Sequence, residues 1–280
     1  MTNISIVTDS SSDIPPHLAA QLGITVIPLR IAMGARVYRD GMDMDRAELY
    51  RHLSRAAVQA SAEPPLPEEM FRVYTRLLKN SDQVLSIHLS SKLSRTALVA
   101  QEAAKTFLGV NKITVVDSKL ISCGLELVVT AAAEAAQRGA SMEDIVRLTR
   151  GMVPHVYMVF FVENMDHMER QGYHTRTRPS SDGLSGGRPL LILEDGDITP
   201  LDKVRTRGKS VDRLFEFVSE FAYFDRVTIL QGRLADEAQL LFERLNDAFP
   251  DKRLEIKPYG SVLATYLGPD ALGVTVHDRV

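Results

Sequence analysis

The residues with the clearest chemical potential lie in one segment, residues 87–96, which reads IHLSSKLSRT. Its three serines, Ser90, Ser91 and Ser94, stand between an apolar stretch that predicts a strand and an alanine-rich stretch that predicts a helix. Such a junction directs backbone N–H groups, serine hydroxyl groups and the positive end of the helix dipole toward one point. The segment therefore predicts a site for a carboxylate or phosphate group, with Ser91 at the start of the helix.

The composition excludes several classes of protein. The chain has 280 residues, of which 45% are hydrophobic and 25% charged, and its formal net charge is −3. This charge does not provide the basic surface by which proteins bind nucleic acids. The single cysteine, Cys123, excludes an internal disulfide and a thiolate metal cluster, and the histidine spacing fits no metal site. With no signal segment and no apolar run of about 20 residues, we expect a cytoplasmic protein without a membrane span, metal or cofactor.

The first half of the chain alternates strand and helix patterns. We expect strands at residues 4–8, 24–32, 83–89 and 112–116, and helices at residues 15–22, 45–56, 67–78, 93–107 and 123–138. Strands separated by helices of this length are typical of βαβ units and a parallel sheet. Ligands of such sheets bind at the carboxyl ends of the strands, which is where the three serines stand. Pro28, inside the second strand, indicates an edge strand or a bulge.

The pattern changes in the second half, so we predict one domain at residues 1–152 and another at residues 153–280. A continuous apolar strand at 156–162 is followed by a polar segment at 170–187, which we interpret as a long surface loop. Asp195-Gly196 indicates a hairpin turn. Further strands are expected at 190–193, 198–204, 227–231, 254–257 and 274–277, and helices at 208–221 and 236–249. The predicted fold class is two-domain α/β, with a parallel, Rossmann-like sheet domain and a second, mixed α/β domain.

The start of the second half combines aromatic side chains with flexible thioethers. These residues are Met158, Phe160, Phe161, Met165 and Met168. Such side chains form ordinary cores, and they also suit an irregular apolar cavity. Together with a head-group site on the first domain, they would bind an amphiphile in a cleft between the domains. Each buried methylene contributes about 0.8 kcal/mol, so a long acyl chain would contribute on the order of 10 kcal/mol.

Five short motifs follow one another along nearly the whole chain. They read VTDS at 7–10, VIPL at 26–29, LSSKLS at 89–94, VDS at 116–118 and DG at 195–196. In this order they resemble the DegV family of fatty-acid-binding carrier proteins. The resemblance implies two α/β domains with a long-chain fatty acid buried between them. It also implies a carrier that is not itself an enzyme and that presents the fatty acid to a separate kinase, which phosphorylates the carboxylate.

The resemblance also implies roles for individual residues. The hydroxyl group that binds the fatty-acid carboxylate corresponds to Ser91, and a second hydroxyl group corresponds to Ser61. Arg188 stands where the family has a basic residue before proline. Tyr266 stands where the family has a histidine, and it could still donate a hydrogen bond to a carboxylate. Ile27, in the VIPL motif, joins the expected acyl-chain pocket.

Two alternative functions stay open at this point. One is a free-standing enzyme that acts on a small phosphorylated or carboxylated metabolite through Asp9, Ser91 and a histidine such as His88. The other is a divergent regulatory relative that has lost its ligand. The second alternative is suggested by Tyr266 and by Tyr173, which replaces the arginine of the family's Lys-Gly-Gly-Arg motif.

Overall fold

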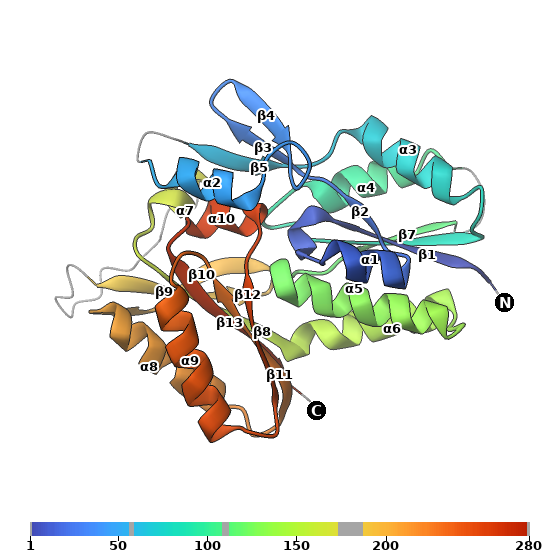
Figure 1. The fold of residues 1–280 in the computed structure, drawn as a ribbon. Coiled ribbons are helices and arrows are strands. Elements are labelled where there is room, and N and C mark those ends of the chain that lie inside the picture. Colours follow the sequence, from blue (N-terminus) through green and yellow to red (C-terminus); the bar gives the residue numbers. More distant parts are fainter. Residues whose placement is uncertain (1, 56–58, 108–111, 173–186, 279–280) are drawn as a thin grey trace. The chain divides into compact units, whose positions relative to one another are not determined.

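The structure is a computed structural model that describes residues 2–55, 59–107, 112–172 and 187–278 (Figure 1). Its internal contacts divide the chain into two units. The amino-terminal unit contains Met1–Arg46 and Ala60–Pro154, and the carboxyl-terminal unit contains Ala47–Gln59 and His155–Val280. The segment Ala47–Gln59 groups with the second half of the chain, so the predicted first domain at residues 1–152 is corrected there.

The amino-terminal unit is built around a four-stranded parallel sheet. In spatial order the strands are β2 (Thr25–Ile27), β1 (Ile4–Asp9), β6 (Gln83–His88) and β7 (Ile113–Asp117). The parallel sheet predicted from the alternating pattern is confirmed. Because the strands are parallel, the carboxyl ends of β1, β6 and β7 share one edge of the sheet. This edge brings together Asp9, His88 and Asp117.

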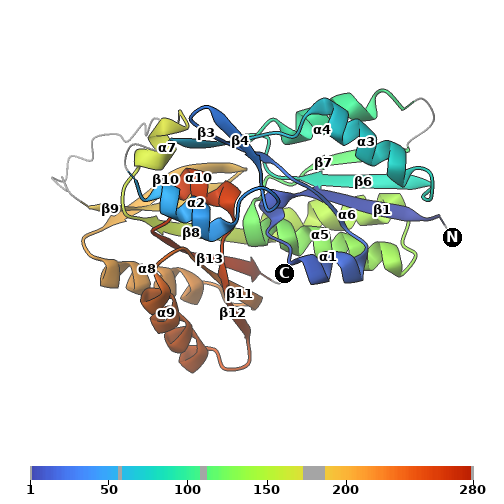
Figure 2. The same cartoon turned by 45° about the horizontal axis from the view of Figure 1, so that its top comes forward.

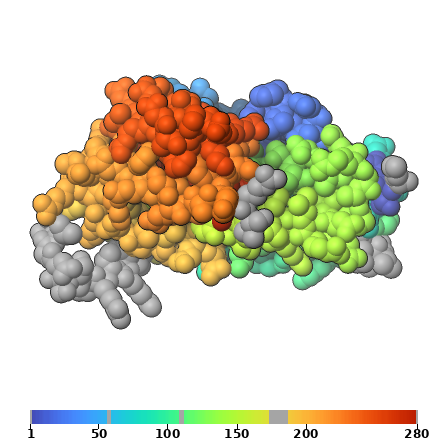
Figure 3. Space-filling model, turned by 90° about the horizontal axis from the view of Figure 1, so that it is seen from below, coloured from blue at the N-terminus to red at the C-terminus, as the bar shows by residue number. Residues whose placement is uncertain are grey.

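Helices cover both faces of the parallel sheet (Figures 1 and 2). On one face lie α3 (Pro67–Leu77) and α4 (Thr96–Ala104), and on the other lie α1 (Pro16–Leu22), α5 (Ser122–Gln137) and α6 (Met142–Met152). The core under α3 and α4 contains Val7, Ile27, Met70, Tyr74, Val84, Val99, Ala100 and Ala103. Ser141 caps α6 by accepting the N–H of Asp144. The outer surface of α5 and α6 is the light green region of Figure 3.

A small antiparallel sheet corrects the strand predicted at residues 24–32. This sheet consists of β3 (Arg30–Met33), β4 (Arg36–Arg39) and β5 (Ala60–Glu63). Pro28 separates β2 from β3, because proline has no N–H group to donate to a neighbouring strand. β2 is the edge strand of the parallel sheet, which agrees with the position that Pro28 indicated.

The carboxyl-terminal unit contains a six-stranded mixed sheet. In spatial order the strands are β10 (Asp197–Val204), β9 (Arg188–Glu194), β8 (Val156–Val162), β13 (Ala271–Asp278), β11 (Phe224–Gln231) and β12 (Arg253–Pro258). All neighbours run antiparallel except β11 and β12. Two helices, α8 (Arg207–Ser219) and α9 (Ala235–Ala248), pack on one face. The apolar strand at 156–162 and the hairpin between β9 and β10 are confirmed.

Three short helices complete the carboxyl-terminal unit. They are α2 (Arg46–Leu53), α7 (Asp166–Arg170) and α10 (Ser261–Leu267), and they lie close together in Figures 1 and 2. Tyr50 of α2 donates its hydroxyl hydrogen to the carbonyl oxygen of Tyr259 at 2.8 Å, and the two ring centroids are 5.6 Å apart. This contact explains why the segment that contains α2 groups with the second half of the chain.

Candidate functional site

The serine loop, residues 89–94, connects β6 to α4. α4 begins at Thr96, and its N-cap residue is Arg95. The hydroxyl group of Ser94 accepts the N–H of Thr96 at 3.3 Å and shares a hydrogen bond with the Thr96 hydroxyl at 2.8 Å. Ser94 therefore stabilises the first turn of the helix. Ser91 is separated from α4 by a turn, so the expectation that it stands at the helix start is wrong.

Every backbone N–H group from Ser90 to Ser94 donates a hydrogen bond inside the protein. The acceptors are Leu120 O for Ser90, Asp117 Oδ1 for Ser91, Ser90 Oγ for Lys92, and Ser90 O for both Leu93 and Ser94, at 2.9–3.2 Å. The loop does not offer unpaired N–H groups to an anion, contrary to our expectation, because the buried Ser90 takes three of them. The hydroxyl group of Ser91 belongs to an exposed residue and is a donor that a ligand can reach.

The end of β7 and the residues that follow it form hydrogen bonds with the serine loop and with β6. Ser118 donates its N–H to the carbonyl oxygen of His88 at 3.0 Å. Asp117 accepts the N–H of Ser91 at 3.2 Å and the N–H of Lys119 at 2.9 Å, both through Oδ1. These contacts fix the backbone of Ser91 relative to β6 and β7.

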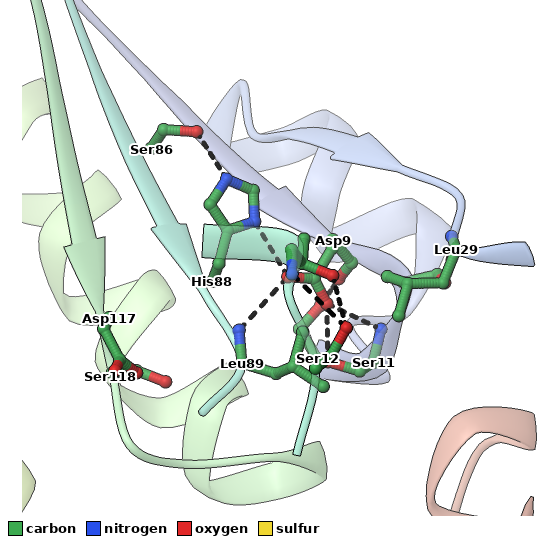
Figure 4. A network of polar contacts seen from close by, with 12 residues as sticks. Asp9, Ser11, Ser12, Leu29, Ser86, His88, Leu89, Asp117 and Ser118 are labelled. Carbon is green, nitrogen blue, oxygen red and sulfur yellow. Dashed lines mark hydrogen bonds and ion pairs between the residues drawn. The ribbon is translucent and has the colours of Figure 1, made fainter. Parts of the chain in front are cut away.

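A buried polar network lies behind the serine loop (Figure 4). Asp9, at the end of β1, is fully buried. Its Oδ1 accepts the N–H of Ser11 at 3.1 Å and the hydroxyl hydrogen of Ser11 at 2.5 Å. Its Oδ2 accepts the N–H of Leu89 at 3.1 Å and lies 2.8 Å from Nδ1 of His88. Because a carboxylate can only accept, we assign a proton to Nδ1. Asp9 thus connects the first residue of the serine loop to β1.

The network continues from His88 to Tyr74. Nε2 of His88 lies 2.7 Å from Oγ of Ser86, and the Tyr74 hydroxyl donates to the same oxygen at 2.9 Å. Burial raises the pKa of Tyr74 to about 12, so its hydroxyl group remains a donor at neutral pH. The hydrogen bonds form a chain in which Tyr74 donates to Ser86, Ser86 donates to His88, and His88 donates to Asp9. All four side chains are buried.

This arrangement bears on the hypothesis of a free-standing enzyme. Asp9 and His88 form a close pair, but both are buried and both are satisfied inside the network. Ser91 is exposed, and its N–H is donated to Asp117. A general base must reach the proton that it abstracts. The Asp9–His88 pair therefore fits a structural role, in which it joins the ends of β1 and β6.

Arg188, which the resemblance places near a ligand carboxylate, already contacts a carboxylate of the protein. Its Nε donates to Oε2 of Glu163 at 2.8 Å, and its Nη1 donates to the carbonyl oxygen of Arg205 at 3.0 Å. Arg207 donates to the other oxygen of Glu163. A ligand carboxylate at Arg188 would have to compete with Glu163.

Ser61 and Tyr266 lie in elements that the sequence analysis missed. Ser61 is half-buried in β5, where it pairs with Ala32 of the amino-terminal unit. Tyr266 is buried in α10 of the carboxyl-terminal unit. Tyr173 and the rest of residues 173–186, most of the predicted surface loop, lie outside the described residues.

The residues expected to line one acyl-chain cavity lie on two faces of the mixed sheet. Successive residues of a strand point to opposite faces. Phe161 belongs to the core under α8 and α9, whereas Met158 and Phe160 point to the other face of β8. Phe160 and Phe161 therefore cannot line the same cavity, and the prediction is corrected in this respect. The continuous apolar run contained no alternation from which this could be read.

The other expected pocket residues have separate surroundings. Phe160 packs against Gly273 of β13, where an added Cβ would lie 2.6 Å from Cδ1 of Phe160. Met168 is buried in α7, and Met165 is the partly exposed N-cap residue of that helix. Ile27 belongs to the core of the amino-terminal unit. Ile27 thus has a structural role there, whether or not it contacts a ligand.

Among the described residues, no group of three or more histidine, cysteine, aspartate and glutamate side chains could hold a metal ion. Within the same parts of the chain, no helix is both long enough and apolar enough to cross a membrane.

Comparison with known proteins identifies the family. The model of a family described as "Uncharacterised protein, DegV family" matches residues 3–279. The chain belongs to the DegV family. It is 31% identical to a DegV domain-containing protein of Caldanaerobacter subterraneus, and the match covers 100% of both chains. It is 30% identical to protein DegV of Bacillus subtilis, over 97% of this chain and 98% of the relative. The resemblance drawn from the five motifs is confirmed.

Solved structures of DegV proteins share the fold. One, described as fatty acid binding of a DegV family protein from Thermus thermophilus, has a TM-score of 0.89 and 27% sequence identity. Another, described as DegV, a fatty acid binding protein from Bacillus subtilis, has a TM-score of 0.89 and 28% identity. Each match covers 100% of both chains. The predicted α/β class, with a parallel sheet and a second mixed sheet, is confirmed.

In this DegV chain, Asp117 accepts a hydrogen bond from the serine loop, and the sequence analysis did not predict this contact. The VDS motif at 116–118 was used as a mark of the family, and no contact between Asp117 and Ser91 was predicted from it. A carboxylate at the end of a parallel strand next to the serine-bearing strand was the available signal, because neighbouring strands end at one edge. Tyr74 and Ser86 gave no comparable signal, since their contact depends on how α3 packs on the sheet.

Acidification is expected to destabilise the carboxyl-terminal unit. Burial lowers the pKa of His167, whose ring packs against Gly268, and burial likewise lowers the pKa of His277 in β13. In the unfolded chain both histidines titrate near pH 6.5. Below about pH 6.5 the unfolded state therefore binds more protons, and stability falls until the pH has passed the lower pKa values of the folded state.

Thermal unfolding at a series of pH values, from neutral to about 5, measures this loss of stability. A double variant, His167→Gln with His277→Gln, should show a shallower decrease over the same range. If the double variant lost stability as steeply as the unchanged protein, other groups would be responsible for the pH dependence.

Proposed function

We propose that this DegV-family protein binds a long-chain fatty acid. The observation that carries the proposal is its similarity, over the full length of both chains, to two DegV proteins that are described as fatty acid binding. The serine loop supports it, because the hydroxyl group of Ser91 can donate a hydrogen bond to a carboxylate. The buried, satisfied Asp9–His88 pair favours binding over the enzyme hypothesis.

The roles of individual residues are part of this proposal. Ser91 donates to the fatty-acid carboxylate, and Ser61, Tyr266 and Arg188 are further candidates for contacts with that group. Ser90 and Ser94 act by stabilising the backbone, since the Ser90 hydroxyl accepts the N–H of Lys92 in the loop and the Ser94 hydroxyl accepts the N–H of Thr96 at the start of α4. The acyl chain contacts apolar side chains, for which the candidates are Ile27, Met158, Phe160, Met165 and Met168. Burial of the chain supplies most of the affinity, and the head group sets the orientation.

We further propose that the protein is a carrier and that a separate kinase phosphorylates the bound fatty acid. The support for this step is the resemblance of the serine motif to DegV carriers. In a reconstituted reaction with ATP, a fatty acid kinase catalytic subunit should form acyl phosphate from oleate only when this protein is present.

The first experiment asks what the protein binds. Native mass spectrometry of protein purified from a bacterial host should show a bound fatty acid. The same measurement after delipidation and addition of palmitate or oleate should restore the bound species at a stoichiometry of one. A protein that purifies empty and takes up neither fatty acid would overturn the proposed function.

Ser91→Ala is expected to weaken oleate binding by about 10-fold, because one hydrogen bond to a charged group is lost while the contacts of the acyl chain remain. Displacement of a fluorescent fatty acid measures the change. Ser91→Thr keeps a hydroxyl group at the same position and should retain most of the affinity. If Ser91→Ala bound oleate as tightly as the unchanged protein, Ser91 would not contact the carboxylate.

A further inference from the structure

Asp117 places a negative charge beside the proposed head-group site. Its Oδ1 lies 3.2 Å from the backbone nitrogen of Ser91 and 2.9 Å from that of Lys119. The side chain is half-buried. Both of these hydrogen bonds come from backbone N–H groups, which carry no net charge. These two hydrogen bonds therefore hold the carboxylate in place and do not remove its negative charge.

The position of this charge affects any ligand bound by Ser91. A serine hydroxyl lies about 3 Å from its own backbone nitrogen, so a head group hydrogen-bonded to Ser91 is within about 9 Å of Asp117. This distance is less than the Debye length of about 10 Å at 0.1 M salt. An ionised head group is consequently repelled by Asp117, whereas an uncharged head group is not.

The backbone of the loop does not offset this repulsion. All five N–H groups from 90 to 94 already donate to acceptors of the protein, so none of them compensates the charge of a ligand. Lys92 and Lys119 lie in the same two loops, and both have contacts of their own. Their positive charges reduce the repulsion from Asp117, which limits the expected effect to a moderate factor.

We propose that Asp117 sets the charge preference of the head-group site: it holds the serine loop in place and weakens the binding of an ionised head group relative to an uncharged one. This inference rests on the proposed function, because it concerns a lipid whose head group lies at Ser91. The acyl chain then supplies the affinity, and the limited affinity for the carboxylate favours release of the ligand, as a carrier requires.

The Asp117→Asn variant tests the proposal. Asparagine retains an oxygen that can accept the N–H groups of Ser91 and Lys119, so the loop keeps its support while the charge is removed. Two ligands with the same chain, oleate and oleyl alcohol, are compared at pH 8 in low salt by displacement of a fluorescent fatty acid. Oleate should bind about 3- to 10-fold more tightly to the variant, and oleyl alcohol should change less than about twofold. The difference should decrease at high salt.

Two further variants test whether the effect depends on the position of the charge and on the hydrogen bonds of Asp117. Glu102→Gln removes the same charge from the exposed face of α4 and should leave the binding of both ligands unchanged. Asp117→Ala removes the acceptor as well and should weaken oleyl alcohol binding, because the loop loses two hydrogen bonds. Equal changes for both ligands in Asp117→Asn, or no tightening of oleate, would overturn the role of Asp117. If the unchanged protein bound neither ligand, the proposed function itself would fail.

Discussion

Replacing Asp9 by alanine is expected to lower the free energy of unfolding by about 3–5 kcal/mol. The substitution removes the acceptor of four buried donors, which are the N–H and hydroxyl of Ser11, the N–H of Leu89 and Nδ1–H of His88. These donors left water when the protein folded, and without Asp9 they regain no hydrogen bond in the interior. Urea unfolding followed by circular dichroism measures the loss.

Two variants and one local measurement make the Asp9 prediction specific. Glu102→Ala removes an exposed carboxylate from the same unit and should change stability by less than about 0.5 kcal/mol. Asp9→Asn keeps one acceptor oxygen but directs an NH₂ group at other donors. Its free energy of unfolding should therefore lie between those of the unchanged protein and Asp9→Ala. The amide hydrogen of Leu89 should exchange faster in Asp9→Ala, since its acceptor is gone. A loss below about 1 kcal/mol would contradict the structural role of the network.

Phe161→Ala is expected to lower the free energy of unfolding of the carboxyl-terminal unit by about 3–5 kcal/mol. Phe161 is fully buried in the core that α8 and α9 form with the mixed sheet. Alanine at this position loses the buried ring and leaves a cavity that the helices fill only in part. Thermal or urea unfolding measures the change.

The neighbouring residue, Phe160, provides the matched control, because it has the same side chain on the opposite face of β8. Both alanine variants should be less stable. Under the proposed function only Phe160→Ala should alter the relative affinity for palmitate and stearate, since it alone changes the face where the acyl chain is placed. A shift in chain-length preference for Phe161→Ala, as large as that for Phe160→Ala, would contradict the assignment of the two faces.

Most of the fold could be predicted from the sequence, because its elements have strong local patterns. The strand at 156–162, the cap at Ser141 and the hairpin between β9 and β10 are each encoded by a few adjacent residues. The elements that were missed are short. β4 and β5 have four residues each and α10 has seven, so their patterns are too brief to recognise. The start of α4 was misplaced because Ser90 closes a turn that precedes the helix.

The candidate site could be predicted only in part. The serine motif drew attention to Ser91, because the hydroxyl groups are adjacent in sequence. The partners that hold the serine loop come from other strands: Asp9 is 80 residues from Leu89, and Asp117 is 26 residues from Ser91. Hydrogen bonds over such separations follow from the order of strands in the sheet, which local patterns do not determine. The assignment of Phe160 and Phe161 to one cavity failed for a related reason, since an all-apolar strand does not reveal which face is covered.

The grouping of Ala47–Gln59 with the carboxyl-terminal unit has a consequence for protein engineering. Neither unit corresponds to one uninterrupted stretch of sequence, since the chain passes from one to the other after residues 46, 59 and 154. A chimera of two homologues joined near residue 152 would combine Tyr50 of one parent with Tyr259 of the other and could disturb their hydrogen bond. Exchange of either whole unit between homologues therefore calls for three junctions, at these same points.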